Sequence, residues 1–136
     1  MAEASITWIR DIQFVATDST NHSVVLSKPG EDSIGMKPSE LLLAAVGSCT
    51  GADVVNILHK KRLTLTGLRV KVQGEQAPTP PWAFQKIHIH YEVEGPDIRE
   101  KDVEKAIALS EEKYCSVSAT LKPQVKITWD YELSSS

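Results

Sequence analysis

The sequence predicts an α+β fold in which short strands lie before and after one long apolar helix. Two observations carry this prediction. The segment Leu41–Leu58 has Asp53 as its only charged residue, and the segments on either side of it alternate apolar and polar residues. Alternation with a period of two is typical of half-buried strands. The expected order is β-β-β-α-β-β-α-α-β, in a single domain of residues 1–136, an ordinary domain length.

The N-terminal part is predicted to be a small antiparallel meander followed by the long helix. Short extended segments cover residues 5–10, 13–17 and 24–27, and turn-prone residues separate the last two. The stretch KPGEDSIGMKP contains two glycines and two prolines, so we expect a loop there. Proline suits the first position of a helix. We therefore expect the helix to run from about Pro38 to Lys60.

The C-terminal half is predicted to hold two strands, two helices and a last strand. The expected elements are strands 63–73 and 86–94, a helix from Asp97 to about Tyr114, a short helix from Cys115 or Ser116, and strand 124–133. In the second of these strands, one face carries Ile87, Ile89, Tyr91 and Val93. Between the first two strands, GEQAPTPPW has three prolines in nine residues and is expected to be a surface connection.

The composition excludes several classes of function. The chain has 15 basic and 18 acidic residues, a formal net charge of −3, and its only run of adjacent basic residues is 60–62. Such a run after an apolar helix is typical of a solvated helix end, so we expect no nucleic-acid binding. The uncharged run Leu41–Ala52 is shorter than the about 20 residues that span a bilayer. The N-terminus MAEASITWIR lacks the pattern of a secretory signal, so a cytoplasmic protein without membrane contact is expected.

Two cysteines, at positions 49 and 115, fit neither a disulfide framework nor a CxxC motif. Cys49 lies in mid-helix within GSCTG, where the helix dipole is weak and apolar surroundings raise a thiol pKa. It is therefore either a small packing residue or a nucleophile that another part of the fold activates. Cys115 stands where one helix ends and another begins, and helix N-terminal amides favour an anion. It is either a half-buried structural thiol or a thiol with a lowered pKa.

Three further side chains are candidates for a site. Glu40 lies in the first turn of the long helix, where a carboxylate complements the helix dipole without any catalytic role. His88 and His90 stand two apart on one strand face, a spacing that some metal sites use. No third ligand is marked in the sequence, and exposure to solvent explains the two histidines. We therefore predict no metal and no cofactor.

Two motifs resemble those of a known family. The stretch KPSELLLAAVGSCTGADVV, followed by LSEEKYCSVSATL, resembles the OsmC/Ohr family of osmotically inducible and organic hydroperoxide resistance proteins, over most of the chain. In that family a Pro-x-Glu-Leu helix start, here at Pro38, leads to a central-helix cysteine, here Cys49. A second cysteine, here Cys115, opens a Cys-x-Val-Ser motif. The resemblance implies an OsmC-like intertwined α+β homodimer in which the central helices are buried together.

The resemblance also implies a cysteine-based thiol peroxidase that reduces organic hydroperoxides. Cys49 would become a sulfenic acid, and Cys115 would resolve it to a disulfide that an external thiol reduces. A buried thiolate needs a nearby cation. The family supplies an arginine held by the glutamate of the helix start, and Arg10 and Glu40 are the matching residues here. The expected partners are a second copy of the chain, an organic hydroperoxide and a thiol reductant.

Two departures from the family pattern indicate a divergent branch. The SEEKYC run before Cys115 puts Glu111 and Glu112 close to that thiol, and neighbouring negative charges raise a thiol pKa.

The second departure concerns the glutamate of the helix start. Glu40 precedes Cys49 by nine residues, whereas the two main peroxidase branches carry this glutamate one position earlier, where this chain has Ser39. One position rotates a helical side chain by about 100°. The alternative hypothesis is a non-enzymatic module whose cleft holds a small ligand, with structural cysteines. The connection near Trp82 and Phe84 would then form a wall of that cleft.

Overall fold

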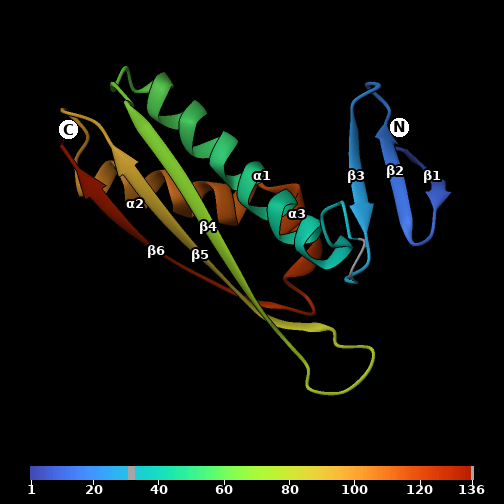
Figure 1. Cartoon of the computed structure of the whole chain (residues 1–136). Helices are drawn as coiled ribbons and strands as arrows, with labels where there is room; N and C mark the ends of the chain where they lie inside the picture. Colours follow the sequence, from blue (N-terminus) through green and yellow to red (C-terminus); the bar gives the residue numbers. More distant parts are fainter. Residues whose placement is uncertain (31–32, 136) are drawn as a thin grey trace. The chain divides into compact units, whose positions relative to one another are not determined.

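The computed structural model describes residues 1–30 and 33–135 of the chain, and it confirms the predicted α+β order (Figure 1). Its elements are β1 (Ala4–Arg10), β2 (Gln13–Asp18), β3 (Ser23–Ser27), α1 (Pro38–Lys60), β4 (Gly67–Gln76), β5 (Phe84–Glu94), α2 (Glu100–Leu109), the π-helical turn η1 (Ser110–Tyr114), α3 (Ser116–Leu121) and β6 (Lys126–Ser134).

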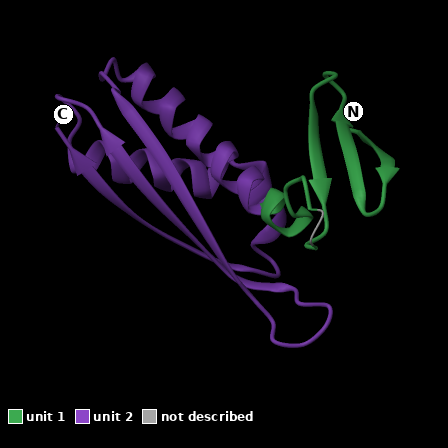
Figure 2. Ribbon diagram, viewed as in Figure 1, with its two compact units in different colours: residues 1–42 green, residues 43–136 purple. Residues whose placement is uncertain are grey.

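The described chain divides into two compact units, Met1–Leu42 and Leu43–Ser136 (Figure 2). Unit 1 holds the predicted antiparallel meander, with strand order β1-β2-β3. The turn between β2 and β3 is held by Asp18, whose carboxylate accepts hydrogen bonds from the backbone amides of Thr20 and His22 at 2.9 and 3.0 Å. These bonds close the hairpin locally, as expected for an aspartate in a turn.

Unit 2 holds a second sheet, of order β4-β5-β6, with helices against it (Figure 1). β4 pairs with β5 antiparallel, whereas β5 pairs with β6 in parallel. A parallel pair requires a crossover connection. Here α2, η1 and α3 form that connection between β5 and β6. The parallel pairing places residues of β5 and β6 with equal sequence offsets side by side along the sheet.

The alternation predicted for β5 is confirmed. Its inward side chains are Ile87, Ile89, Tyr91 and Val93, each at most 1% exposed. They pack in one core with Val46, Val54 and Leu58 of α1 and with apolar residues of α2. Burial of these side chains removes apolar surface from water and is the main favourable contribution to the stability of this unit.

Two glycines let α1 pack closely on β4. A Cβ atom added at Gly47 would lie 2.9 Å from Cγ2 of Val72, and one added at Gly51 would lie 3.4 Å from Cγ2 of Val70. The first distance is a clash with a stiff β-branched side chain, whereas the second is close to an ordinary contact. The small residues around Cys49 therefore serve the helix–sheet contact at Gly47 above all.

We expect alanine to change the unfolding free energy differently at these two glycines. Alanine gains up to about 1 kcal/mol of helix propensity at either position, but at Gly47 overpacking against Val72 costs about 1–3 kcal/mol. Gly51→Ala should thus equal or exceed the wild type in unfolding free energy, and Gly47→Ala should be less stable than Gly51→Ala. Urea unfolding followed by circular dichroism measures both variants. Equal stability of the two variants would contradict the close approach at Gly47.

The structure corrects two predicted boundaries. β4 begins at Gly67 rather than at Leu63, because the amide of Leu63 donates to the carbonyl of Leu58 and closes the end of α1 at 3.1 Å. α2 begins at Glu100 rather than at Asp97. The carboxylate of Asp97 instead accepts a hydrogen bond from the amide of Thr64 at 3.1 Å, so Asp97 holds the loop between α1 and β4. Arg99 is the capping residue of α2.

Only one face of α1 is buried within the single chain. The buried residues of this helix are Val46, Gly47, Thr50, Gly51, Val54 and Leu58. The residues exposed along it include Leu42, Ala44, Ser48, Ala52 and Asn56. At 23 residues, α1 is long and apolar enough to cross a membrane by length and composition, criteria that the core helix of a soluble protein also meets.

Candidate functional site

The fold of unit 2 brings the two cysteine thiols together. Cys49 lies in the middle of α1 and is partly buried, and Cys115 is the capping residue of α3, 2% exposed. Both cysteines are free, and the Cys49 thiol is near enough to Cys115 to influence its pKa. This proximity of residues far apart in sequence arises because α1 and the β5–β6 crossover pack against the same sheet.

The environment of Cys115 does not lower its thiol pKa, which was one of the two alternatives that the sequence left open. Burial raises the pKa of Cys115, and the neighbouring Cys49 thiol raises it further. The amide of Ser118 donates to Sγ of Cys115 at 3.4 Å and acts in the opposite direction. The helix-start amide that we expected is present, but desolvation of the thiolate outweighs it. Cys115 therefore rests as a thiol and needs a base when it reacts.

A buried carboxylate is connected to this thiol through hydrogen bonds of one intervening residue, Ser118. Glu111 belongs to η1 and is 8% exposed. The hydroxyl of Ser118 donates to Oε1 of Glu111 at 3.2 Å, while the amide of the same serine donates to Cys115. Ser118 thus joins the carboxylate to the thiol. The π-helical turn helps to place Cys115, whose amide donates to the carbonyl of Ser110 at 2.8 Å.

One oxygen of Glu111 is held less firmly than the other. Within the described part of the chain, Oε2 of Glu111 is buried without a hydrogen-bond partner, and its nearest cation is Nζ of Lys122 at 3.7 Å. Lys122 also donates to the backbone carbonyl of Glu111. A buried carboxylate oxygen without a hydrogen bond has an open position for a proton. The sequence indicated only that Glu111 is a charge close to Cys115. The burial of Glu111 depends on its place in η1.

A chain of buried hydroxyls leads away from the thiols. Oγ1 of Thr50, the residue after Cys49, lies 2.7 Å from the hydroxyl of Tyr91 and 2.8 Å from Oγ of Ser110. Ser110 in turn donates to Oδ2 of Asp53 at 2.7 Å. A hydroxyl has one hydrogen. Because that of Ser110 goes to Asp53, Thr50 must donate to Ser110, and Tyr91 must donate to Thr50.

This chain of hydroxyls fixes three elements around the thiols. It joins β5 through Tyr91, α1 through Thr50 and η1 through Ser110. Burial raises the pKa of Tyr91, so its hydroxyl stays protonated and remains a donor. Sequence reasoning missed all of these roles, because serine, threonine and tyrosine are ordinary residues without a motif around them.

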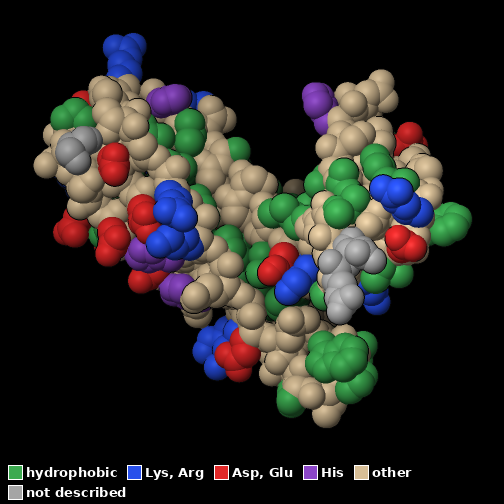
Figure 3. Space-filling view, in the orientation of Figure 1, with side chains coloured by type: hydrophobic (Ala, Val, Ile, Leu, Met, Phe, Trp, Pro, Cys, Tyr) green, Lys and Arg blue, Asp and Glu red, His purple; other side chains and the backbone are tan. Residues whose placement is uncertain are grey.

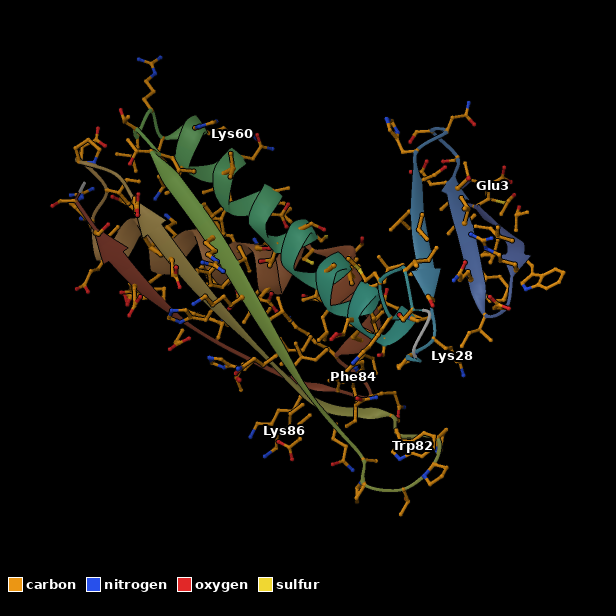
Figure 4. The ribbon with its side chains drawn as sticks, in the orientation of Figure 1. Glu3, Lys28, Lys60, Trp82, Phe84 and Lys86 are labelled. Atoms are coloured by element: carbon orange, nitrogen blue, oxygen red, sulfur yellow. The ribbon has the colours of Figure 1, made fainter. Side chains whose placement is uncertain are left out.

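Asp53, at which the series of hydrogen-bonded hydroxyls ends, lines a groove between α1 and the α2–η1 segment. The groove has a volume of about 560 Å³ and is lined by Asp53, Asn56, Ile57, Lys60, Lys61, Lys105, Leu109 and Tyr114. Lys60 stands at the end of α1 (Figure 4). The hydroxyl chain thus extends from the protein interior to a groove with both charged and apolar walls.

The remaining predicted site residues, Arg10 and Glu40, belong to unit 1, whereas both thiols belong to unit 2. Arg10 ends β1 of unit 1 and is exposed. Glu40 lies in the first turn of α1 with its side chain 51% exposed, and its Oε1 is 3.9 Å from Nζ of Lys37. This position agrees with the helix-start role that the sequence allowed for Glu40.

The connection between β4 and β5 folds back on itself. The amide of Ala77 donates to the carbonyl of Ala83 at 2.8 Å, and the side chain of Gln76 donates to the carbonyl of Trp82 at 2.9 Å. Figure 4 labels Trp82 on this connection and Phe84 at the start of β5. Trp82 is 54% exposed, and Phe84 lies against Gly74. These contacts give the loop its own shape without a bound ligand.

The fold and the paired thiols define a class of α+β proteins with a cysteine in a central helix and a second one at the start of a later helix. Residues 30–130 match the family model described as OsmC-like protein. The chain is 34% identical over 131 residues to protein YhfA of Escherichia coli, covering 96% of this chain and 97% of the relative. The chain therefore belongs to the OsmC-like family, and the predicted OsmC/Ohr membership is confirmed.

Solved structures share the same fold. A hypothetical protein from Aquifex aeolicus is 32% identical, with 98% of each chain covered and a TM-score of 0.84. An organic hydroperoxide resistance protein from Elizabethkingia anophelis, crystallised with thiocyanate, is 11% identical, with 98% of this chain and 96% of that chain covered and a TM-score of 0.75. At that identity, the second likeness supports the fold alone.

Proposed function

We propose that this protein is a thiol peroxidase that reduces organic hydroperoxides. The observation that carries the proposal is the proximity of the Cys49 thiol to Cys115, whose pKa it influences, because a peroxidatic and a resolving thiol must meet. Membership of the OsmC-like family supports it, as do relatives that share the fold and are named organic hydroperoxide resistance proteins.

In the first step, the thiolate of Cys49 attacks one oxygen of the hydroperoxide. An S–O bond forms, the O–O bond breaks, and the leaving alkoxide takes a proton to become an alcohol. The sulfur is oxidised to sulfenic acid while the peroxide is reduced. The partly buried position of Cys49 on α1 would give the peroxide access, and the almost complete burial of Cys115 supports the second role for that residue.

In the second step, Cys115 attacks the sulfenic sulfur of Cys49. The S–S bond forms, the S–O bond breaks, and the hydroxyl group leaves as water with the proton that Cys115 gives up. The raised thiol pKa of Cys115 means that a base must take this proton. Glu111 is suited to that role, because it is buried, has an oxygen without a hydrogen bond, and is joined to Cys115 through Ser118. An external dithiol then reduces the disulfide.

Arg10 and Glu40 complete the proposed site. The Cys49 thiolate needs a compensating cation, and Arg10 matches the arginine that serves this purpose in the family. Glu40 would hold the guanidinium. Its ion pair with Lys37, at 3.9 Å with both side chains about half exposed, is worth at most about 1 kcal/mol and can be exchanged.

The proposed enzyme is a homodimer in the cytoplasm. The exposed small residues Ala44, Ser48 and Ala52 follow one another at intervals of four along α1. Residues at this spacing share a helix face. A second copy that covers this face would bury the apolar side of α1 that the single chain leaves open. The homodimer also agrees with the fold that family membership implies.

Peroxide turnover tests the proposal. The reduced protein, given cumene hydroperoxide and a dithiol, should consume peroxide catalytically, and Cys49→Ser should reduce the rate to that of the dithiol alone. Thr120→Val is the control, because it changes an exposed side chain of α3 whose hydroxyl donates only to the helix carbonyl of Ser116. Equal consumption by Cys49→Ser and the wild type would refute the proposal. It would favour the alternative of a binding module with structural cysteines.

A further inference from the structure

A row of titratable side chains lies on the outer face of the second sheet. The residues of β5 that alternate with its buried core positions are His88, His90 and Glu92. Parallel pairing sets His88 beside Thr128, His90 beside Asp130, and Glu92 beside Glu132. Figure 3 shows purple, red and blue side chains gathered over β5 and β6. The pairing thus brings together groups that the sequence separates by about forty residues.

Three side chains of this row converge on one point. Nε2 of His90 lies 3.6 Å from Oε2 of Glu132 and 4.0 Å from Oε2 of Glu92. One ligand atom from each of these residues lies within 4.8 Å of the other two. Ligand bonds of about 2.0–2.1 Å in a tetrahedral zinc site set neighbouring ligand atoms about 3.3 Å apart. The three atoms therefore need to move by about 1 Å or less, within the reach of flexible carboxylates.

The other nitrogen of His90 is already held. Its Nδ1 lies 2.8 Å from Oδ1 of Asp130, and the same oxygen lies 2.7 Å from Nε2 of His88. When Nδ1–H donates to Asp130, the neutral ring presents the lone pair of Nε2 to the two glutamates. Metal-binding histidines almost always donate the second ring N–H to a carboxylate, a backbone carbonyl or water, which fixes the tautomer and the ring orientation.

We propose that His90, Glu92 and Glu132 form a binding site for a divalent cation of the zinc class, with Asp130 as the orienting carboxylate. One imidazole nitrogen and two carboxylate oxygens leave a fourth position open for water, as in accessible zinc sites. Glu132 is 74% exposed, so an ion can enter from solvent. Of the three proposed ligands, the sequence pointed only to His90, which it paired with His88. Glu132 comes from β6 and reaches the site through the parallel pairing of β5 with β6.

A lysine competes with the cation for this site. Nζ of Lys71, on the neighbouring strand β4, lies 3.0 Å from Oε2 of Glu92, the same oxygen that faces His90. Binding of the ion must displace this ammonium group or share the carboxylate with it. Removal of the lysine charge should therefore tighten binding, a result that a merely structural role of these side chains does not produce.

Zinc titration of the untagged, reduced protein tests the site. The two thiols bind zinc as well, so the titration uses the wild type and a Cys49→Ser/Cys115→Ser variant, with affinity measured by competition against a chromophoric chelator. In the double variant we expect one equivalent of Zn²⁺ to bind. NMR signals of the imidazole of His90 should shift, while those of His59 at the end of α1 stay unchanged. This readout is independent of peroxidase activity.

Variants in the same background decide the ligands. His90→Gln and Glu132→Gln should weaken binding by at least about 10-fold each, and Asp130→Asn by about 10–100-fold. Lys71→Met should tighten binding, and His59→Gln should leave it unchanged. Affinity that does not respond to His90→Gln, or that falls with Lys71→Met, would overturn the proposal and identify the row as a solvated polar face.

Discussion

Replacement of Thr50 by valine is expected to lower the unfolding free energy by about 2–4 kcal/mol. The methyl group that replaces the hydroxyl keeps the shape of the side chain, but the hydrogen bonds to Tyr91 and Ser110, of 2.7 and 2.8 Å, are lost. Tyr91 is fully buried, so the hydrogen of its hydroxyl is left without an acceptor and water cannot reach it. An unsatisfied buried polar group costs about 1–3 kcal/mol, and the second lost bond adds about 1 kcal/mol.

A double-mutant cycle separates the hydrogen bond from packing. Tyr91→Phe removes the hydroxyl that Thr50→Val would leave unsatisfied, so the double variant should lose clearly less stability than the sum of the single variants. Thr120→Val is the matched control, because Thr120 is exposed on α3 and its hydroxyl binds only the carbonyl of Ser116. Denaturant unfolding measures all four proteins. Additive losses, or an equal loss in Thr120→Val, would contradict the buried hydroxyl chain.

The elements that could be predicted are those whose signal is local. Pro38 and the helical run after it gave the bounds of α1, which the structure confirms. The alternation from Ile87 to Val93 gave β5 and its buried face. These signals depend on residues within one element, where helix and strand periods differ clearly. The order of strands in the second sheet has no such signal, and the parallel pairing of β5 with β6 could not be predicted from the residues.

The candidate site likewise has residues that could be predicted from local sequence signals and properties that depend on packing. The two motifs identified Cys49 and Cys115, but the residues alone left the direction of the change in the Cys115 pKa open. Helix position is readable from sequence, whereas desolvation depends on what packs around the thiol. Glu111 illustrates the same limit, because a carboxylate in SEEKYC resembles a solvated helix charge until the π-helical turn buries it.

Replacement of Glu111 by glutamine should slow formation of the Cys49–Cys115 disulfide by roughly 100-fold and leave the first oxidation of Cys49 nearly unchanged. The amide oxygen can still accept the hydrogen bond of Ser118, so the surroundings of Cys115 are retained. What is lost is the base that takes the thiol proton, and a positioned base contributes about 10²–10⁴-fold to a proton transfer. This result separates the two steps of the proposed reaction.

Peptide mapping after one equivalent of cumene hydroperoxide provides the measurement, with dimedone present to trap sulfenic acid. The wild type should give mainly the Cys49–Cys115 crosslink, and Glu111→Gln should give mainly the dimedone adduct of Cys49. Glu112→Gln is the matched control, because Glu112 is the next residue of the same turn but is exposed. If Glu111→Gln and Glu112→Gln form the crosslink at equal rates, Glu111 is not the base. Since burial holds Cys115 as a thiol, another group would then have to accept its proton.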